Sequence, residues 1–265
     1  MYAFEYQRPA SRDAAKAAAT GADTRYLAGG QSLIQAMRLR LSQSERLVDL
    51  GGIADLKGIK AENGGVTIGA MATHAAVAAN AEVRRVIPAL ADLAGGIGDP
   101  MVRNMGTIGG SIANADPAAC YPAAVLALNA TVQTDRRTIA ADAFFIGLYE
   151  TALQPGELIT AVSFPAAQMA AYVKYRQQAS RFALIGVFVA QTAGGVRVAV
   201  TGAKSRVFRA TEIENALAQS FTADAAKAVK MPNTDINGDL HGSAEYRAAM
   251  ISVMAGRAVA AALAR

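Results

Sequence analysis

Two glycine-rich segments constrain this chain most, because each lies at a junction between regular elements. Residues 28–32 follow a predicted strand and precede a predicted helix. Residues 106–111 begin a second segment that contains several glycines. Glycines at such junctions let backbone amides approach a ligand closely, and a helix N-terminus adds the positive end of its dipole. A tight turn is the simpler interpretation of either loop alone. Two loops together could hold the two phosphates of a dinucleotide.

The remaining pattern predicts three packed parts without repeats. Residues 1–52 have a β-α-β-turn-α-β order, which indicates a parallel sheet. A hairpin follows over residues 59–70, with Asn63-Gly64 as its turn. The further segments expected are helices over 74–79, 83–93 and 122–128, strands over 131–134, 158–164, 172–176 and 197–202, a strand or helix over 182–190, and helices over 211–219, 223–229 and 246–264.

Composition narrows the class of protein. The chain of 265 residues is 52% hydrophobic and 18% charged, which excludes disorder. Only 6% of the residues are aromatic and none is Trp, so the core should be aliphatic and built from small residues. The net charge is +5, but the basic residues are scattered, which argues against nucleic-acid binding. An acidic partner protein fits that charge at least as well.

Cysteine and histidine usage limits the chemistry. The single cysteine, Cys120, excludes an intramolecular disulfide, and it excludes a cysteine-ligated cluster or zinc site within this chain. His74 and His241 lie far apart without ligand spacing, so we expect no metal site here. The N-terminus has no apolar signal region and no run approaches 18 apolar residues, so we expect a cytoplasmic protein without a membrane span.

Common phosphate-binding and catalytic motifs are absent. No G-x-G-x-x-G follows a strand, and no P-loop motif occurs. Ser32 and Ser111 have no neighbouring histidine, and we interpret His74 as a helix-surface or capping residue rather than a catalyst. The residues by themselves therefore indicate an α/β protein that binds an anionic or dinucleotide ligand.

Five ordered segments resemble a known family. Residues 28–41, 98–117, 172–176, 179–187 and 238–247 are similar to the FAD-binding medium subunit of molybdenum hydroxylases, the carbon monoxide dehydrogenase and xanthine dehydrogenase group. The resemblance covers nearly the whole chain. It implies an α+β fold: a two-part FAD-binding domain of the vanillyl-alcohol-oxidase (PCMH) type in residues 1–55 and 56–165. A small C-terminal domain, an antiparallel sheet with helices, is implied for residues 166–265.

The resemblance also assigns cofactor-binding residues. The two glycine loops would hold the FAD pyrophosphate, Ile159 would contact adenine, and Lys174 would lie beside the flavin, where a cation stabilises a reduced, anionic ring. No catalytic acid or base is implied. The residues assigned are Arg25, Leu27, Ala28, Gly29, Gly30, Gln31, Ser32, Leu33, Ile97, Gly98, Val102, Gly106, Thr107, Ile108, Gly109, Gly110, Ser111, Ala113, Asn114, Cys120, Ile159, Lys174 and Phe182.

Two of these residues depart from the family pattern. Cys120 stands where the family usually has an Asp that bonds the cofactor, and a thiol is a poorer acceptor, so we expect that contact to weaken or to pass to water. Phe182 stands where relatives often have a Tyr over the flavin. The alternative interpretations are that Cys120 is buried filler, which only occupies space in the interior, and that Phe182 is plain core.

The resemblance implies an electron-transfer flavoprotein. Partner subunits would carry molybdopterin and 2Fe–2S clusters, in a dimer of heterotrimers, and this chain would pass electrons to NAD+, a quinone or another external acceptor. Two alternatives stay open at this point. One is a freestanding flavin-dependent oxidoreductase, and the other is a scaffold subunit that has lost FAD.

Overall fold

A small parallel sheet begins the chain in the computed structural model, which describes residues 1–21 and 23–265. Its strand order is β1-β3-β2, and both neighbouring pairs are parallel, as predicted. Ser11 caps the first helix by accepting a hydrogen bond from the amide of Ala14. The elements are β1 (Glu5–Gln7), α1 (Arg12–Ala18), β2 (Thr24–Leu27), α2 (Leu33–Arg38), β3 (Arg46–Asp49) and two 3-10 turns, η1 (Leu50–Gly52) and η2 (Ala54–Leu56).

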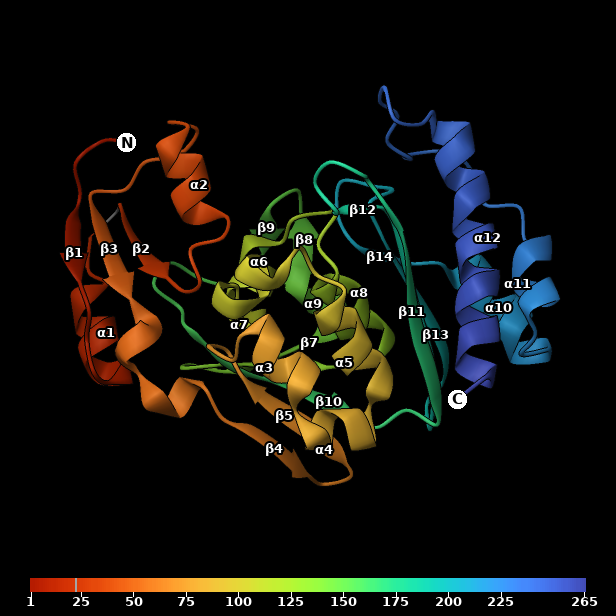
Figure 1. Ribbon diagram of the computed structural model, residues 1–265, viewed down its shortest axis with the longest axis horizontal. Coiled ribbons are helices and arrows are strands. Elements are labelled where there is room, and N and C mark those ends of the chain that lie inside the picture. The colour runs from red at the N-terminus through yellow and green to blue at the C-terminus, as the bar shows by residue number, and fades with distance from the viewer. Residues whose placement is uncertain (22) are drawn as a thin grey trace.

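The middle of the chain forms a five-stranded antiparallel sheet in the order β4-β5-β10-β6-β7. Asn63 and Gly64 form the predicted turn of its first hairpin, with φ of 51° and 72°. A separate two-stranded ribbon pairs β8 with β9. Figure 1 shows this middle part between the parallel sheet and the C-terminal part of the chain. The strands are β4 (Ile59–Glu62), β5 (Gly65–Gly69), β6 (Thr131–Thr134), β7 (Thr138–Ala140), β8 (Phe145–Gly147), β9 (Glu150–Thr151) and β10 (Ile159–Pro165).

Short helices cover this sheet. Thr73 caps the first of them as predicted, accepting from the amide of Ala76 at 3.2 Å. The single helix expected over 83–93 is wrong: Ile87 leaves helical geometry (φ −141°, ψ 73°), because the following Pro88 disfavours it. The helices are α3 (His74–Ala79), α4 (Ala81–Val86), α5 (Pro88–Gly95), α6 (Pro100–Met105), α7 (Ile108–Asn114), α8 (Tyr121–Ala127) and α9 (Ala141–Phe144).

The C-terminal part is an antiparallel sheet, β11-β12-β13-β14, covered on one face by the C-terminal helices and on the other by helices of the central part. For the segment 182–190 the sequence allowed either a strand or a helix, and its residues 183–190 belong to strand β12. Its alternate residues pack into two different cores, Phe188 against the central helices and Val187 against the C-terminal helices, so it has no polar face that reveals a period. The elements are β11 (Met169–Arg176), β12 (Ala183–Thr192), β13 (Gly195–Thr201), β14 (Phe208–Arg209), α10 (Thr211–Gln219), α11 (Ala223–Ala228) and α12 (Ala244–Leu263).

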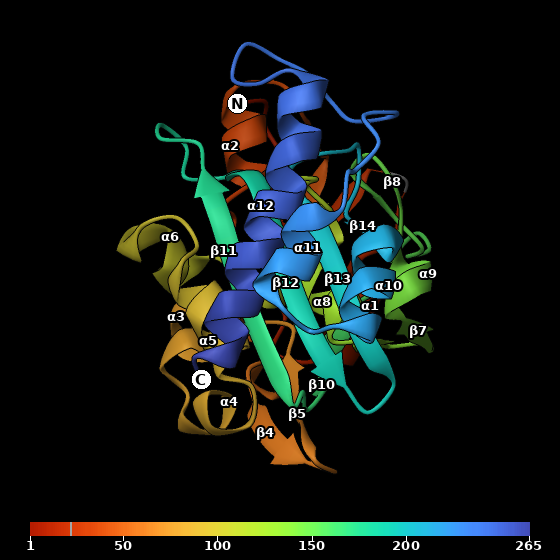
Figure 2. The same cartoon turned by 90° about the vertical axis from the view of Figure 1, so that its right-hand side faces the viewer.

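Helix α12 is the longest of the described chain. Among the described helices it alone has the length and mean hydropathy (1.2) that a membrane-spanning helix needs, and 56% of its apolar window is buried. Figure 2 shows it lying along the C-terminal sheet, where it contacts β11 and β12. Its apolar composition is therefore accounted for by packing in the fold. The boundaries at residues 55/56 and 165/166 stay a prediction.

Candidate functional site

A cavity of about 410 Å³ is lined by residues of the parallel sheet, the central helices and the edge of the C-terminal sheet. Every residue assigned from the resemblance lines it except Ile108, whose side chain is fully buried in the central core. The assigned residues that line it are Arg25, Leu27, Ala28, Gly29, Gly30, Gln31, Ser32, Leu33, Ile97, Gly98, Val102, Gly106, Thr107, Gly109, Gly110, Ser111, Ala113, Asn114, Cys120, Ile159, Lys174 and Phe182. Their contact with a cofactor stays a prediction.

The glycine loops touch each other. A Cβ built on Gly29 would lie 2.1 Å from the carbonyl oxygen of Met105, and one on Gly106 would lie 2.6 Å from His74 Nε2. A Cβ on Gly109 would meet the Cβ of Ala70 at 2.6 Å. We expected these glycines to admit a ligand to the backbone. That expectation stays a prediction, and at Gly29, Gly106 and Gly109 the structure shows a further requirement, which is close packing between protein segments.

The two loops differ in the amides that they offer. In the second loop the amides of Ile108 and Gly109 donate to the carbonyls of Ala72 (3.1 Å) and Ala70 (2.9 Å), and that of Gly110 donates to Thr107 Oγ1 (3.1 Å). The amides of residues 29–33, by contrast, have no acceptor among the described residues. Amides without an acceptor among the described residues are therefore concentrated in the first loop.

Three cations line the cavity without a carboxylate partner in residues 1–21 and 23–265. Arg25 donates to Ser42 Oγ (3.0 Å), Arg181 donates to the Gly98 carbonyl (3.3 Å), and Lys174 donates to the Gly96 carbonyl (3.0 Å). Because neutral oxygens do not neutralise their charges, these groups favour an anionic ligand.

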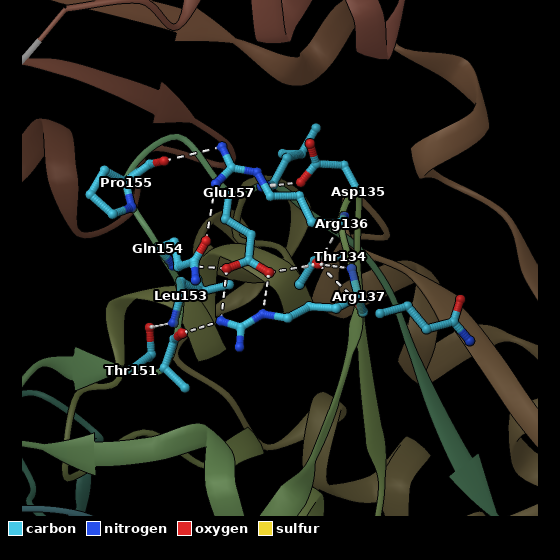
Figure 3. A network of polar contacts seen from close by, with 12 residues as sticks. Thr134, Asp135, Arg136, Arg137, Thr151, Leu153, Gln154, Pro155 and Glu157 are labelled. Atoms are coloured by element: carbon cyan, nitrogen blue, oxygen red, sulfur yellow. Dashed lines mark hydrogen bonds and ion pairs between the residues drawn. The ribbon is translucent and has the colours of Figure 1, made fainter.

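A buried carboxylate, Glu157, also lines the cavity, and it lies at the centre of a network of polar contacts (Figure 3). Glu157 is 5% exposed and accepts two hydrogen bonds from Arg137, one at each oxygen and both 3.0 Å long. The amide of Gln154 and the hydroxyl of Thr134 also donate to it, each at 2.8 Å. The Arg137 contact, followed by these two, lowers the pKa of Glu157 to about 2.

Thr134 and Arg137 belong to a turn formed by residues 134–137, and the other residues of this turn hold the rest of the 152–158 loop (Figure 3). Asp135 accepts from the amide of Leu158 (2.8 Å), and Arg136 donates to the carbonyl of Pro155 (3.1 Å). Lys16 of α1 lies 3.3 Å from Asp135. The loop therefore has a fixed shape where Leu153, Leu158 and Ile159 line the cavity.

His74 is neither a surface nor a capping residue, contrary to our expectation. It is the first residue of α3, 5% exposed, and it lines the cavity next to Gly106. Its Nδ1 has no hydrogen-bond partner among the described residues. Burial, assisted by the charge of Arg103, lowers the pKa of His74 to about 4, so the imidazole is neutral at physiological pH.

The two departures from the family pattern both face the cavity. Cys120 is 5% exposed, and Lys174 Nζ lies 3.4 Å from its sulfur. Phe182, which immediately precedes β12, is 46% exposed, so its interpretation as plain core is wrong. Cys120 is buried, as its alternative interpretation expects, and it also lies on the cavity wall beside a cation.

Several lining residues were missed from the sequence. Some are immediate neighbours of assigned residues and could have been found that way, such as Tyr26, Leu158 and Arg181. Glu157 and Met71 had no local signal, because only the folded chain brings them to the cavity. The missed residues are Tyr26, Leu50, Ala70, Met71, His74, Asp116, Ala119, Leu153, Glu157, Leu158, Ser180 and Arg181. Within the described ranges, no cluster of His, Cys, Asp and Glu has a metal-binding arrangement.

Comparison with known proteins identifies relatives over the full length. Residues 2–167 match the family described as FAD binding domain in molybdopterin dehydrogenase. The chain is 37% identical over 284 residues to the carbon monoxide dehydrogenase medium chain of Hydrogenophaga pseudoflava, covering 99% of this chain and 98% of that one. It is 34% identical over 278 residues to the nicotine 6-hydroxylase medium subunit of Paenarthrobacter nicotinovorans, with coverage of 99% and 98%. Reconstituted CO dehydrogenase from Oligotropha carboxidovorans superposes with a TM-score of 0.90 at 35% identity, over 100% of this chain and 99% of that chain.

Proposed function

The chain belongs to the family of FAD-binding medium subunits of molybdenum hydroxylases, and on that premise we propose that it relays electrons. It takes them from the 2Fe–2S clusters of a partner subunit and passes them to an external acceptor, NAD+, a quinone or another oxidant. Substrate oxidation takes place at molybdopterin in the large subunit. The observation that carries the proposal is that the cavity is lined both by the amides of residues 29–33 and by three cations that have no carboxylate partner among the described residues.

The cavity suits FAD by size and by charge. Ligand sites in proteins commonly have volumes of about 300–1,000 Å³, and this one has about 410 Å³. The pyrophosphate of FAD carries negative charge, which the free amides and the cation Arg25 bind, whereas we assign Lys174 to the flavin ring. A scaffold that no longer binds FAD has no use for these groups, so they argue against that alternative.

The protein's own residues hold and orient the cofactor. We assign the pyrophosphate to the amides of residues 29–33 and to the side chains of Ser32 and Ser111. Leu158 and Ile159 offer apolar surface for the adenine, on the loop that Glu157 fixes. When bound, FAD supplies one-electron and two-electron transfer, and this chain provides no general acid or base.

The complex we propose contains a molybdopterin-binding large subunit and a 2Fe–2S small subunit, in a dimer of heterotrimers. Medium chains of multi-subunit hydroxylases among its relatives support large and small partners. A cytoplasmic location is part of the proposal, and fractionation of the source cells tests it.

The first test is a visible absorption spectrum of the purified full-length chain, followed by heat release and chromatography of the flavin. We expect oxidised-flavin bands and about one FAD per chain. A colourless chain that takes up no FAD, alone or with its partners, would contradict the proposal and favour the scaffold.

A second test concerns the electron route. In the anaerobic complex, the reducing substrate of the large subunit should bleach the flavin bands only when the small subunit with its clusters is present. Bleaching of the isolated chain by its own organic substrate would instead identify a freestanding oxidoreductase.

A further inference from the structure

We propose that the pairing of Lys174 with Cys120, rather than with a carboxylate, raises the reduction potential of the flavin. The inference rests on the proposed function, because it concerns FAD bound in the same cavity. In this proposal, Lys174 and Cys120 together set how readily the flavin of this subunit accepts electrons.

The geometry of Lys174 leaves its charge without a counterion. The side chain comes from β11, in the C-terminal sheet, and reaches the wall of the cavity. Its ammonium donates to the carbonyl of Gly96 at 3.0 Å and to the sulfur of Cys120 at 3.4 Å. Both are uncharged acceptors when the thiol is protonated, and no carboxylate of the described residues forms an ion pair with Lys174.

Cys120 occupies the position from which a counterion would act. It is 5% exposed and directly precedes helix α8, whose residues are buried, so its side chain has a fixed place beside Lys174. A carboxylate there would lie within ion-pair distance of the ammonium, and because Cys120 is buried and Lys174 is half-buried, water would screen the interaction only in part.

The consequence follows from the charge change on reduction. Two electrons and one proton convert the neutral oxidised isoalloxazine into a reduced ring with one negative charge. A cation on the wall that lacks a counterion stabilises the reduced form more than the oxidised form. A counterion at residue 120 would cancel most of that difference, and the flavin would become harder to reduce.

The test compares Cys120→Asp with Cys120→Asn, which has the same size and no charge, in the full-length chain loaded with FAD. The reduction potential is measured by anaerobic spectroscopic titration against a reference dye, and the dissociation constant of oxidised FAD is measured separately. For Cys120→Asp we expect the ratio of the affinities for reduced and oxidised flavin to fall at least tenfold, which is about 30 mV for a two-electron couple. Cys120→Asn should stay close to the native potential.

Two further variants keep the inference falsifiable if Cys120→Asp does not fold or does not bind FAD. Lys174→Met should lower the potential in the same direction, because it removes the charge itself. Cys120→Ser should leave the potential unchanged, since a hydroxyl is also neutral. The inference would be overturned if Lys174→Met has the same potential as the native chain. It would also be overturned if Cys120→Ser has a raised potential, because that result would reveal a thiolate counterion. Absence of FAD from the native chain would instead overturn the proposed function.

Discussion

Gly29 and Met105 meet so closely that no side chain fits between them, since a Cβ on Gly29 would stand 2.1 Å from the Met105 carbonyl oxygen. Gly29 follows strand β2 of the parallel sheet, and Met105 ends helix α6 of the central part. This contact joins the two glycine loops into one wall of the cavity. The conformation of the amide row in residues 29–33 therefore depends on a residue distant in sequence.

Gly29→Ala should separate the loops. We expect the affinity for FAD to fall at least tenfold and the free energy of unfolding to drop by about 1–3 kcal/mol, the usual cost of overpacking. Flavin fluorescence titration and urea unfolding measure the two effects. Gly58→Ala is the matched control, because a Cβ there meets nothing within 4 Å. Native affinity in Gly29→Ala would show that the loop contact does not shape the site.

Glu157→Gln should loosen the 152–158 loop. The substitution removes a buried charge that accepts from Arg137, Thr134 and Gln154, so we expect a loss of about 1–3 kcal/mol in the free energy of unfolding and weaker FAD binding. Glu82→Gln, in an exposed i,i+3 pair with Arg85, should cost less than about 0.5 kcal/mol. If Glu157→Gln and Glu82→Gln lose the same free energy of unfolding, the contacts of Glu157 contribute no more than an exposed ion pair.

The pH dependence of Glu157 follows from its depressed pKa of about 2. Because the unfolded carboxyl titrates near 4.5, its stabilising contribution is complete above that pH and is lost as the pH falls toward 2. The difference in unfolding free energy between the native chain and Glu157→Gln should therefore shrink over this range. A constant difference would contradict the assigned pKa.

His74 should destabilise the fold in acid. Its pKa is about 4 in the folded chain against 6.5 for the free side chain, so the unfolded state binds the proton more readily between these values. Stability should fall by about 3 kcal/mol as the pH drops from 6.5 to 4. His74→Gln should lose this component, and His241→Gln, at an exposed position, should retain it. Parallel pH profiles for His74→Gln and the native chain would refute the prediction.

Arg247 anchors the C-terminal helix. It is 4% exposed and donates to the carbonyls of Leu184 (3.1 Å) and Gly202 (2.8 Å) and to the carboxylate of Asp239 (2.7 Å). Arg247→Met leaves these acceptors unpaired, so we expect a loss of about 2–4 kcal/mol in urea unfolding. Arg257→Met, on an exposed position of the same helix, should change stability by less than about 1 kcal/mol. A similar loss in both variants would assign the effect to the helix in general.

Local patterns predicted most elements of the fold. The Asn63-Gly64 turn and the Thr73 cap lie where expected, because a turn or a cap depends on a few consecutive residues. The single helix expected over 83–93 is wrong, because Pro88 moves Ile87 out of helical geometry and divides the segment into two helices. Strand β12 could not be told from a helix, because burial on both faces removes the alternation that marks a strand.

The sequence by itself determined the family and many, but not all, of the residues that line the cavity, because contiguous motifs carry that information. Only the tertiary structure decided how they act on one another: Gly29 against Met105, Glu157 with Arg137, and Cys120 beside Lys174. The members of each pair lie far apart in the chain, and no local propensity specifies which partner a side chain meets. The packing of the three sheets and their helices fixes the distances within these pairs. Those distances in turn determine the charge distribution and the shape of the cavity.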